Sequence, residues 1–290
     1  MKHARRDLVT IAAALCAACG FANAQSAHYP AGVEGIKGAT LPPPGLYFRS
    51  YNYFYSAPRF PGGPEDFDLF AYVQAPRLIW ITDNQIFGGY YGMDVLLTFP
   101  YQDVKVGPFG DTKFGVGDIF AEPITLSWHS ERSHLAVGYG VWLPNGSFDP
   151  ARLASPGKGF WTHMLTAGAT WHLDAERKWA LSALNRYEIN HENEDTGITP
   201  GQVWTLEYGL SRTFNKTIDV GAAGYFVLQT TEDSGSGASS ARDRLFGIGP
   251  EINVAWPQLG LFASARYVYE TTARNRPRGH TFNLTLTKAL

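Results

Sequence analysis

Apolar and polar residues alternate one by one along much of the chain, in stretches of about ten residues. Because successive side chains of a β-strand point to opposite faces, this period of two predicts strands with one apolar and one polar face. The alternation is clearest at 133–143, 179–190 and 203–214 and weaker elsewhere. In all it predicts twelve strands, at 45–56, 67–81, 86–99, 114–128, 133–143, 160–173, 179–190, 203–214, 217–230, 244–256, 260–270 and 280–290.

The connections between these predicted strands alternate between short and long. The short ones fall at 82–85, 129–132, 174–177, 215–216 and 257–259. The long ones are rich in Gly, Pro, Asp, Ser and Asn and fall at 57–66, 100–113, 144–159, 191–202, 231–243 and 271–279. Outer-membrane barrels have short periplasmic turns and long extracellular loops, whereas a soluble sandwich has no reason to sort its connections. The pattern predicts an all-β, antiparallel transmembrane β-barrel of about twelve strands.

The first 44 residues lie outside this pattern. Residues 1–24 have the order of a cleaved secretory signal: three basic residues, an apolar stretch at 8–21, and Ala-Asn-Ala before Gln25. An alternative is a lipoprotein signal modified at Cys19, although Cys16 stands where an aliphatic residue is usual. Residues 25–44 are rich in Pro and Gly and are expected either to hang in the periplasm or to plug the barrel. The barrel itself is expected at 45–290, in the bacterial outer membrane.

The charge balance excludes one class of partner. Removing residues 1–24 takes three basic and one acidic residue from totals of 24 and 26, which leaves 21 and 25 and a net charge of −4. A chain with this balance has no basic surface for nucleic acid. Both cysteines lie within the predicted signal, so the mature protein has none. No stretch after Gln25 reaches 18 consecutive apolar residues, which excludes a helical membrane protein.

Tryptophan residues gather at the ends of the predicted strands. Amphipathic indole rings favour the interface between membrane and water, so this placement indicates two girdles in contact with outer-membrane lipid and lipopolysaccharide. The girdle residues are Trp80, Trp128, Trp161, Trp171, Trp179, Trp204 and Trp256. In the last strand Phe282, Leu284, Leu286 and Leu290 share one face, similar to the C-terminal signal that the barrel assembly machinery reads. Leu290 replaces the usual terminal aromatic residue.

Charged residues fall on the face of the strands that is expected to line the lumen. They are Asp94, Arg186, Glu188, Glu207, Asp219, Glu251, Arg266 and Glu270. Charges in a narrow interior must be paired or hydrated. We expect Arg186, Glu188 and Glu207 to form one cluster, and Arg266 to pair with Glu251 across neighbouring strands. Two readings stay open: the pairs tie the wall together, or they form a polar constriction on a transport path.

The sequence offers little support for an enzyme or a metal-binding protein. Outer-membrane phospholipases have twelve strands, but no His-x-Ser arrangement lies on an outward face near the outer leaflet. Residues 190–195 carry oxygen ligands that suit Ca²⁺, yet they lack the spacing and the glycine of a calcium loop. Phosphate loops, zinc spacings and dinucleotide fingerprints are missing as well. We therefore expect no catalytic residue, no metal and no cofactor.

Several segments resemble the family of bacterial outer-membrane proteins named for the meta-cleavage pathway of phenol degradation. The matching segments are 41–47, 116–119 with Pro123, 128–129, 143–146 with Phe148 and Asp149, 187–193, Gly224-Tyr225 to Gln229, and 249–251. Each motif is weak alone, but their shared order covers nearly the whole mature chain. The family more often has Thr where this chain has Asn145. The resemblance implies an outer-membrane barrel associated with the catabolism of aromatic compounds, and transport is its inferred role.

Together these observations favour a channel for the passive uptake of small hydrophobic or aromatic solutes. Two rival hypotheses come from other classes. One is a structural or adhesive barrel whose loops bind partners, and the other is a lipid-modifying enzyme. Uptake of labelled aromatic compounds separates the first hypothesis from its rivals, and lipid analysis of a deletion strain tests the enzyme.

Overall fold

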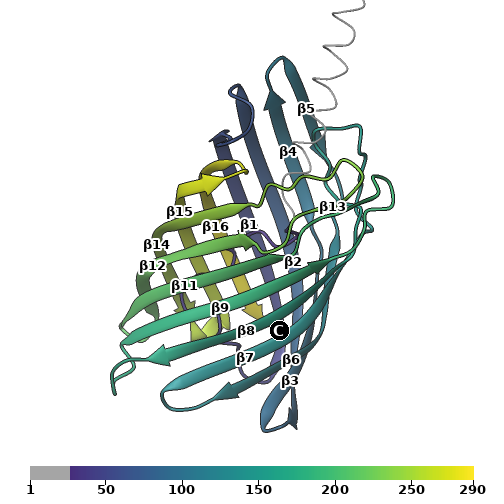
Figure 1. Cartoon of the computed structure of the whole chain (residues 1–290). Helices are drawn as coiled ribbons and strands as arrows, with labels where there is room; N and C mark the ends of the chain where they lie inside the picture. Colours follow the sequence, from purple (N-terminus) through teal and green to yellow (C-terminus); the bar gives the residue numbers. More distant parts are fainter. Residues whose placement is uncertain (1–26) are drawn as a thin grey trace, which may run out of the picture.

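The computed structural model describes residues 27–290, and most of them belong to one antiparallel sheet closed into a barrel (Figure 1). Its strands are β1 (Gly45–Arg59), β2 (Phe67–Ile86), β3 (Gly89–Leu96), β4 (Phe99–Val106), β5 (Phe109–Phe114), β6 (Ile119–His129), β7 (Ser133–Leu143), β8 (Thr162–His172), β9 (Trp179–Asn190), β11 (Val203–Phe214), β12 (Ile218–Gln229), β14 (Arg244–Trp256), β15 (Leu261–Arg274) and β16 (Arg278–Ala289). Two short loop strands, β10 (Ile198–Thr199) and β13 (Ser234–Gly235), pair with each other. The turn before β15 holds a 3-10 helix, η1 (Pro257–Leu259).

The predicted signal peptide at 1–24 and the alternative lipidation of Cys19 lie outside the described residues. Within residues 27–290, no helix is long and apolar enough to cross a membrane.

The barrel closes through β1, which pairs with β2 on one side and with β16 on the other. The wall has twelve strand positions because β3 and β4 both pair with β2, one along its lower part and one along its upper part. In the same way β6 follows β3 and β5 follows β4. The predicted fold class, an antiparallel barrel of about twelve strands, is confirmed.

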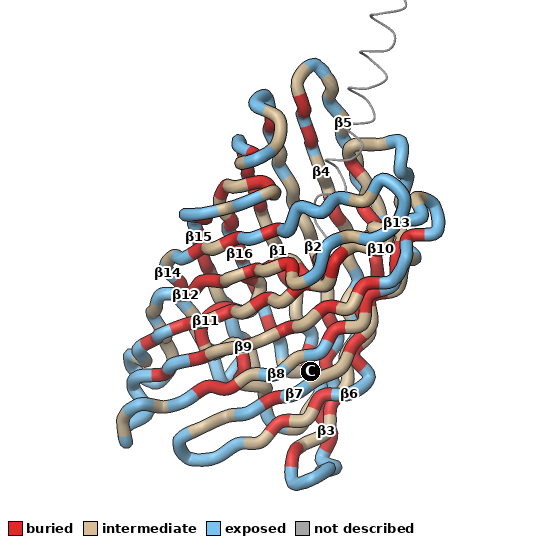
Figure 2. The backbone as a smooth tube through the Cα atoms, viewed as in Figure 1, coloured by how far each residue is buried: buried red, intermediate tan, exposed pale blue. Residues whose placement is uncertain are grey.

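Side chains alternate between the two faces of the wall as their period of two requires. In β7, Leu135 and Val137 are 43% and 41% exposed on the outside, whereas Ala136 between them is 4% exposed. Figure 2 shows this alternation of buried and exposed residues along most strands. The outward positions present apolar side chains, so the wall can contact lipid while its polar residues face inward.

Two of the predicted connections are wrong. Residues 100–113, expected as a loop, form most of the hairpin of β4 and β5, which turns at Gly107. The turn expected at 82–85 lies within β2, and the chain reverses at Phe87-Gly88 instead. Residues that favour turns, such as Gly107 and Asp83, suggested connections at these segments. The segments nevertheless pair with neighbouring strands, so the β-ladder continues along most of their length.

Two of the prolines in the wall, Pro76 and Pro123, mark irregular pairing. At Pro123 the register of β6 shifts against both β3 and β7. At Pro76 the neighbour of β2 changes from β4 to β3. Because proline has no N–H, it is tolerated in a sheet only where the ladder is interrupted.

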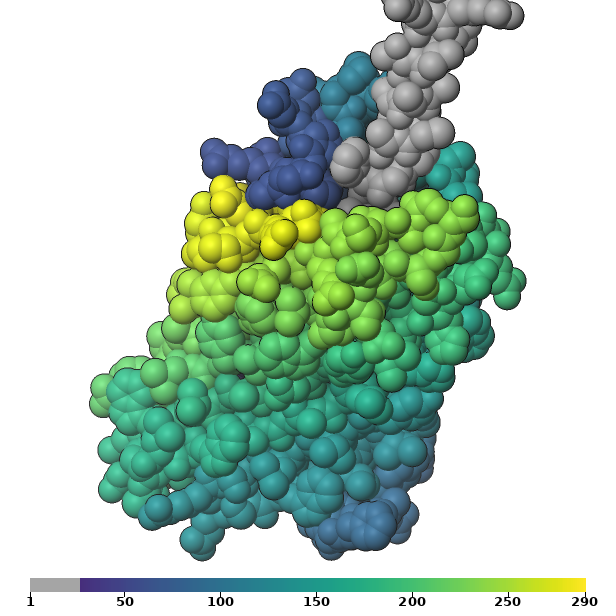
Figure 3. Space-filling view, in the orientation of Figure 1, coloured from purple at the N-terminus to yellow at the C-terminus, as the bar shows by residue number. Residues whose placement is uncertain are grey.

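The upper rim of the barrel is uneven. The connection of β1 with β2 and the hairpin of β4 and β5 rise above the rest of the wall in Figures 1 and 3. β5 has no partner strand on its far side, and the loop at 144–161 covers this edge through Arg152, which pairs with Asp111. An edge without a partner exposes unpaired backbone groups, so this loop completes the wall where the ladder stops.

Candidate functional site

Residues 27–44 lie inside the barrel and fill much of its lumen. We call residues 27–44 the inner segment. Its backbone N–H groups donate hydrogen bonds to three glutamates of the wall, Glu188, Glu207 and Glu251. A buried carboxylate needs several donors to offset its lost hydration. The inner segment supplies these donors from its main chain, so its backbone is bound directly to the wall.

Glu207 binds the turn at residues 32–35 of the inner segment. Its two oxygens accept hydrogen bonds from the N–H groups of Gly32, Glu34 and Gly35, at 3.0, 3.0 and 3.1 Å, and from the Tyr29 hydroxyl. Gly32 and Gly35 have φ of +88° and +68°, values that favour glycine. A side chain at Gly35 would also collide with Arg266 and Glu251. The turn thus depends on glycine at both positions.

His28 anchors the upper end of the inner segment. Its backbone N–H donates to Glu188 at 2.8 Å, and its ring contacts Thr162 at 2.7 Å and Asp118 at 3.0 Å. The ring stacks on Trp142 with 5.5 Å between centroids. Burial lowers the pKa of His28 to about 4, although the hydrogen bond to Asp118 favours the protonated ring. At neutral pH the docked imidazole is therefore uncharged.

Glu251 and Arg266 form the ion pair that the sequence predicted. Arg266 donates to both oxygens of Glu251, at 2.7 and 3.0 Å, from the directly opposite position on β15. The same guanidinium donates to the carbonyl oxygens of Gly32 and Glu34, and Ile36 N–H donates to Glu251 at 2.8 Å. The pair therefore ties the inner segment to the wall as well as one strand to the next.

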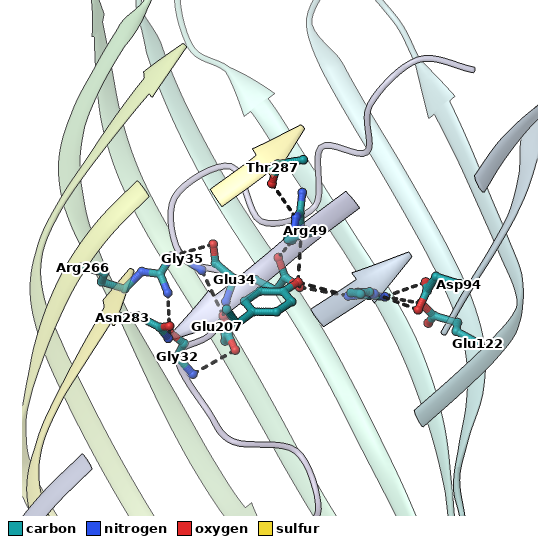
Figure 4. Close-up of polar contacts among 12 residues, drawn as sticks. Gly32, Glu34, Gly35, Arg49, Asp94, Glu122, Glu207, Arg266, Asn283 and Thr287 are labelled. Carbon is teal, nitrogen blue, oxygen red and sulfur yellow. Dashed lines mark hydrogen bonds and ion pairs between the residues drawn. The ribbon is translucent and has the colours of Figure 1, made fainter. Parts of the chain in front are cut away.

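Glu34 forms the centre of a charged layer across the lumen. Its carboxylate lies 3.1 Å from Arg49, 3.3 Å from Arg77 and 3.7 Å from Arg186, and it accepts a hydrogen bond from Tyr51 at 2.8 Å. Figure 4 shows Glu34 on the inner segment with the wall residues around it. Burial alone would raise the pKa of Glu34, but the guanidiniums of Arg49, Arg186 and Arg77 hold it below its usual value. We call Glu34, Arg49, Arg77 and Arg186 the charged layer.

Arg77 extends the charged layer to the opposite wall. It donates to both oxygens of Asp94, at 2.8 and 2.7 Å, and to Glu122 at 2.9 Å. Figure 4 shows these two carboxylates on the far side from Arg266. Because Arg77 also contacts Glu34, a continuous network of ion pairs crosses the lumen from β6 to the inner segment.

Cavities lie along the barrel on both sides of the charged layer. The outer vestibule, of about 450 Å³, lies among the long loops and is lined by Phe60, Phe67, Val104, Phe148, Leu153 and Phe160. The inner cavity, of about 210 Å³, lies between the inner segment and the wall and is lined by Tyr53, Val73, Leu96, Phe120, Trp142 and Met164. The lower cavity, of about 60 Å³, borders Thr40 and Leu41.

The outer vestibule and the inner cavity share part of their lining, namely Leu69, Gln102, Pro156 and Lys158. The inner cavity and the lower cavity meet at Glu34, Arg77 and Arg186. A dry cavity of roughly 150 Å³ holds a benzene molecule. By that measure a single aromatic ring fits the inner cavity and does not fit the lower one. The charged layer lies between the inner cavity and this lower cavity.

The eight lumen residues expected from the sequence all lie inside the wall, but they do not form the expected cluster. Arg186 makes no ion pair with Glu188 or Glu207 among the described residues. Its guanidinium instead lies 4.0 Å from the ring centre of Tyr29 and 3.7 Å from Glu34. The Arg186–Glu188–Glu207 cluster was therefore wrong. The inner segment lies between these three side chains and supplies a partner to each of them.

The remaining lumen residues are also held by specific partners. Asp94 pairs with Arg77, and Asp219 pairs with Lys37 of the inner segment at 2.7 Å. Glu270 accepts hydrogen bonds from Tyr55, Tyr225 and the backbone of Gly279. These pairings are compatible with both hypotheses for the lumen charges: that they tie the wall together, and that they form a polar constriction on a transport path.

The seven tryptophans assigned to the girdles lie on the outside of the wall. Trp80, Trp161, Trp171, Trp179 and Trp256 are between 41% and 50% exposed, and Trp128 and Trp204 are less so. Trp80 lies further from a turn than expected, because β2 continues to Ile86.

Sequence reasoning missed several residues of the site. Arg77 and Glu122 lie in the two strands with the weakest alternation, where proline hid the parity. Asp118 precedes β6 and accepts hydrogen bonds from His28 and from the backbone of Lys158. Trp142 alternates with the apolar residues Val141 and Leu143 of its strand, and this parity was the available signal that its ring faces the lumen.

The sequence matches, over residues 53–286, the family described as "Putative MetA-pathway of phenol degradation". The chain belongs to this family. Among solved structures, the COG4313 outer membrane channel from Pseudomonas putida F1 is similar, with a TM-score of 0.78 and 16% identity. That likeness covers 91% of this chain and 100% of the other. A search of the curated proteins gives no match.

Two autotransporter domains are less similar, each with a TM-score of 0.52. The β domain of Bordetella BrkA is 11% identical and covers 85% of this chain and 99% of its own. The translocator domain of NalP from Neisseria meningitidis is 12% identical and covers 88% and 91%. At such identities the likeness shows the fold alone, which is that of an outer-membrane barrel.

We expect the docking of the inner segment to weaken as the pH falls. Between pH 6.5 and about 4, His28 takes up a proton when the segment is released but not while it is docked. The docking free energy therefore decreases with falling pH, by about 2 kcal/mol at pH 5. Planar-bilayer recordings should show a larger mean current at pH 5 than at pH 7.5. The variant His28→Gln should lose most of this difference, and an unchanged pH response in the variant would contradict the assignment.

Proposed function

We propose that the protein is an outer-membrane channel for the passive uptake of small hydrophobic or aromatic compounds. The observation that carries the proposal is the inner cavity, which is large enough for one aromatic ring and is lined mostly by apolar and aromatic side chains. It adjoins the outer vestibule, which is lined by Phe60, Phe67, Phe148 and Phe160. A solute with an apolar body thus meets apolar surface from the loops down to the charged layer.

The apolar lining distinguishes this path from that of a channel for hydrophilic solutes. Transferring apolar surface out of water stabilises the bound solute by roughly 25 cal/mol per Å². A polar solute gains nothing from this lining and loses part of its hydration. Membership of the phenol-degradation family and the likeness to an outer membrane channel support the same proposal. The outward apolar face then contacts lipid and lipopolysaccharide.

Filling the inner cavity should stop the uptake. Ala71 lines this cavity, and the variant Ala71→Trp places an indole ring in the space that a solute would use. We expect uptake of benzyl alcohol into proteoliposomes, reported by an enclosed dehydrogenase, to fall toward the rate of vesicles without protein. The matched control is Val95→Trp, because Val95 is 40% exposed on the outer face of the neighbouring strand. Equal uptake by Ala71→Trp and the unchanged protein would overturn the proposed path.

A further inference from the structure

The inner cavity is lined by charges as well as by apolar groups, and one of its cations has no partner. Four basic side chains line it, namely Arg77, Lys158, Arg186 and Arg276. Arg77 pairs with Asp94, Glu122 and Glu34, and Arg186 pairs with Glu34. Lys158 also has a partner. Arg276 is the exception: among residues 27–290 it has neither a hydrogen bond nor an ion pair.

Arg276 is nevertheless buried, with 7% of the residue exposed. Its Nε has no hydrogen-bond partner, while the side chain borders the inner cavity. Asp243 is the strongest electrostatic neighbour of the guanidinium but lies beyond ion-pair distance. The buried Nε has lost its hydration and no group of the described chain replaces it, while Asp243 and Glu270 attract the guanidinium only from beyond ion-pair distance. Such a group is set to receive an anion.

The carboxylates that line the cavity are engaged elsewhere. Glu270 accepts from Tyr55, Tyr225 and Gly279, and Asp118 accepts from the backbone of Lys158 and from other donors. Glu34 belongs to the charged layer. None of these acids is placed to neutralise Arg276 at close range, so the cation keeps its attraction for a ligand.

The loop that carries Arg276 is held in place from both sides. On one side, the backbone N–H of Asn275 donates to the carbonyl of Pro61 at 3.1 Å, and its side chain donates to the carbonyl of Arg242 at 2.9 Å. On the other side Tyr55 donates to the carbonyl of Pro277 at 3.2 Å. A cation fixed before the ligand arrives loses little conformational entropy on binding.

We propose that the inner cavity is a binding site for a small aromatic carboxylate, with Arg276 holding the carboxylate and the apolar lining holding the ring. The inference rests on the proposed function and narrows its substrate class. A guanidinium recognises a carboxylate by two parallel hydrogen bonds, which match the planar shapes of both groups. The volume of about 210 Å³ lies below the roughly 300–1,000 Å³ of sites for larger ligands, so the ligand carries one ring.

The test compares benzoate with benzyl alcohol, which has the same ring and no charge. Equilibrium dialysis against the full chain in lipid nanodiscs should show benzoate bound more tightly than benzyl alcohol. The variant Arg276→Gln should weaken benzoate binding by roughly tenfold or more and leave benzyl alcohol binding unchanged. Arg276→Lys keeps the charge and should recover part of the benzoate affinity.

The matched control is Arg274→Gln, because Arg274 is an exposed arginine two residues away and lines no cavity. It should bind both compounds like the unchanged protein. The proposal is overturned if benzoate binds no better than benzyl alcohol, or if Arg276→Gln lowers stability and leaves benzoate binding intact. In both cases continued uptake of benzyl alcohol would leave the proposed function standing. If neither compound enters proteoliposomes, the proposed function itself fails.

Discussion

Replacing Glu34 by Gln is expected to release the inner segment and to raise the mean current through planar bilayers. Glu34 is the common partner of Arg49, Arg77 and Arg186, and its side chain is 10% exposed. Removing one member of a buried ion pair costs about 3–5 kcal/mol because it leaves the other charges unpaired. A loss of that size increases the released fraction by roughly a hundredfold or more.

The matched control for this variant is Glu65→Gln. Glu65 is exposed in the loop between β1 and β2 and forms no hydrogen bond or ion pair with residues 27–290, so its loss should leave the current unchanged. If Glu34→Gln lowers thermal stability without changing the current, the charged layer ties the wall together and does not limit passage. If neither the thermal stability nor the current changes, Glu34 does not hold the inner segment in place.

Locking the inner segment to the wall should have the opposite effect. A Cβ placed at Gly168 would lie 2.8 Å from the Cβ of Ala39, and a disulfide needs about 3.5–4.5 Å between these atoms. The same Cβ would lie 2.7 Å from Leu184 Cδ1, so small shifts of the segment and of the Leu184 side chain let the double variant Ala39→Cys, Gly168→Cys form a cross-link. We expect the oxidised form to take up benzyl alcohol at the rate of empty vesicles, and reduction to restore uptake.

The predicted mature chain contains no cysteine of its own, so the cross-link has no competing thiol. The single variant Gly168→Cys serves as the control, since it adds the same side chain without a bond. Full uptake by the oxidised double variant would show that the solute leaves the inner cavity by a path that does not displace the segment.

The wall of the barrel follows from the sequence because each strand repeats one local rule. A period of two specifies which face of a strand is apolar, and loop length specifies which end of the barrel faces the periplasm. This rule assigned the lumen face of Glu207, Glu251 and Arg266 correctly even though it used no distant contact. It failed between residues 82 and 113, where the strands β2 to β5 are held by their neighbours more than by their own pattern.

The partners of the lumen charges did not follow from the sequence. Parity places Arg186 and Glu207 inside the same barrel but does not say what lies between them. The inner segment has no periodicity that could position it, and its contacts are made largely by backbone N–H groups that every residue except proline has. Gly32 and Gly35 indicate turns in this segment, but they do not indicate which residues of the wall the turns contact.

The three glutamates that bind the inner segment connect distant strands of the wall to residues that precede the first strand. Glu188, Glu207 and Glu251 belong to β9, β11 and β14, whereas their donors precede β1 in the chain. Because β1 also pairs with β16, the wall around the segment is closed. Once this pairing is in place, the inner segment can enter or leave the lumen only through an end of the barrel.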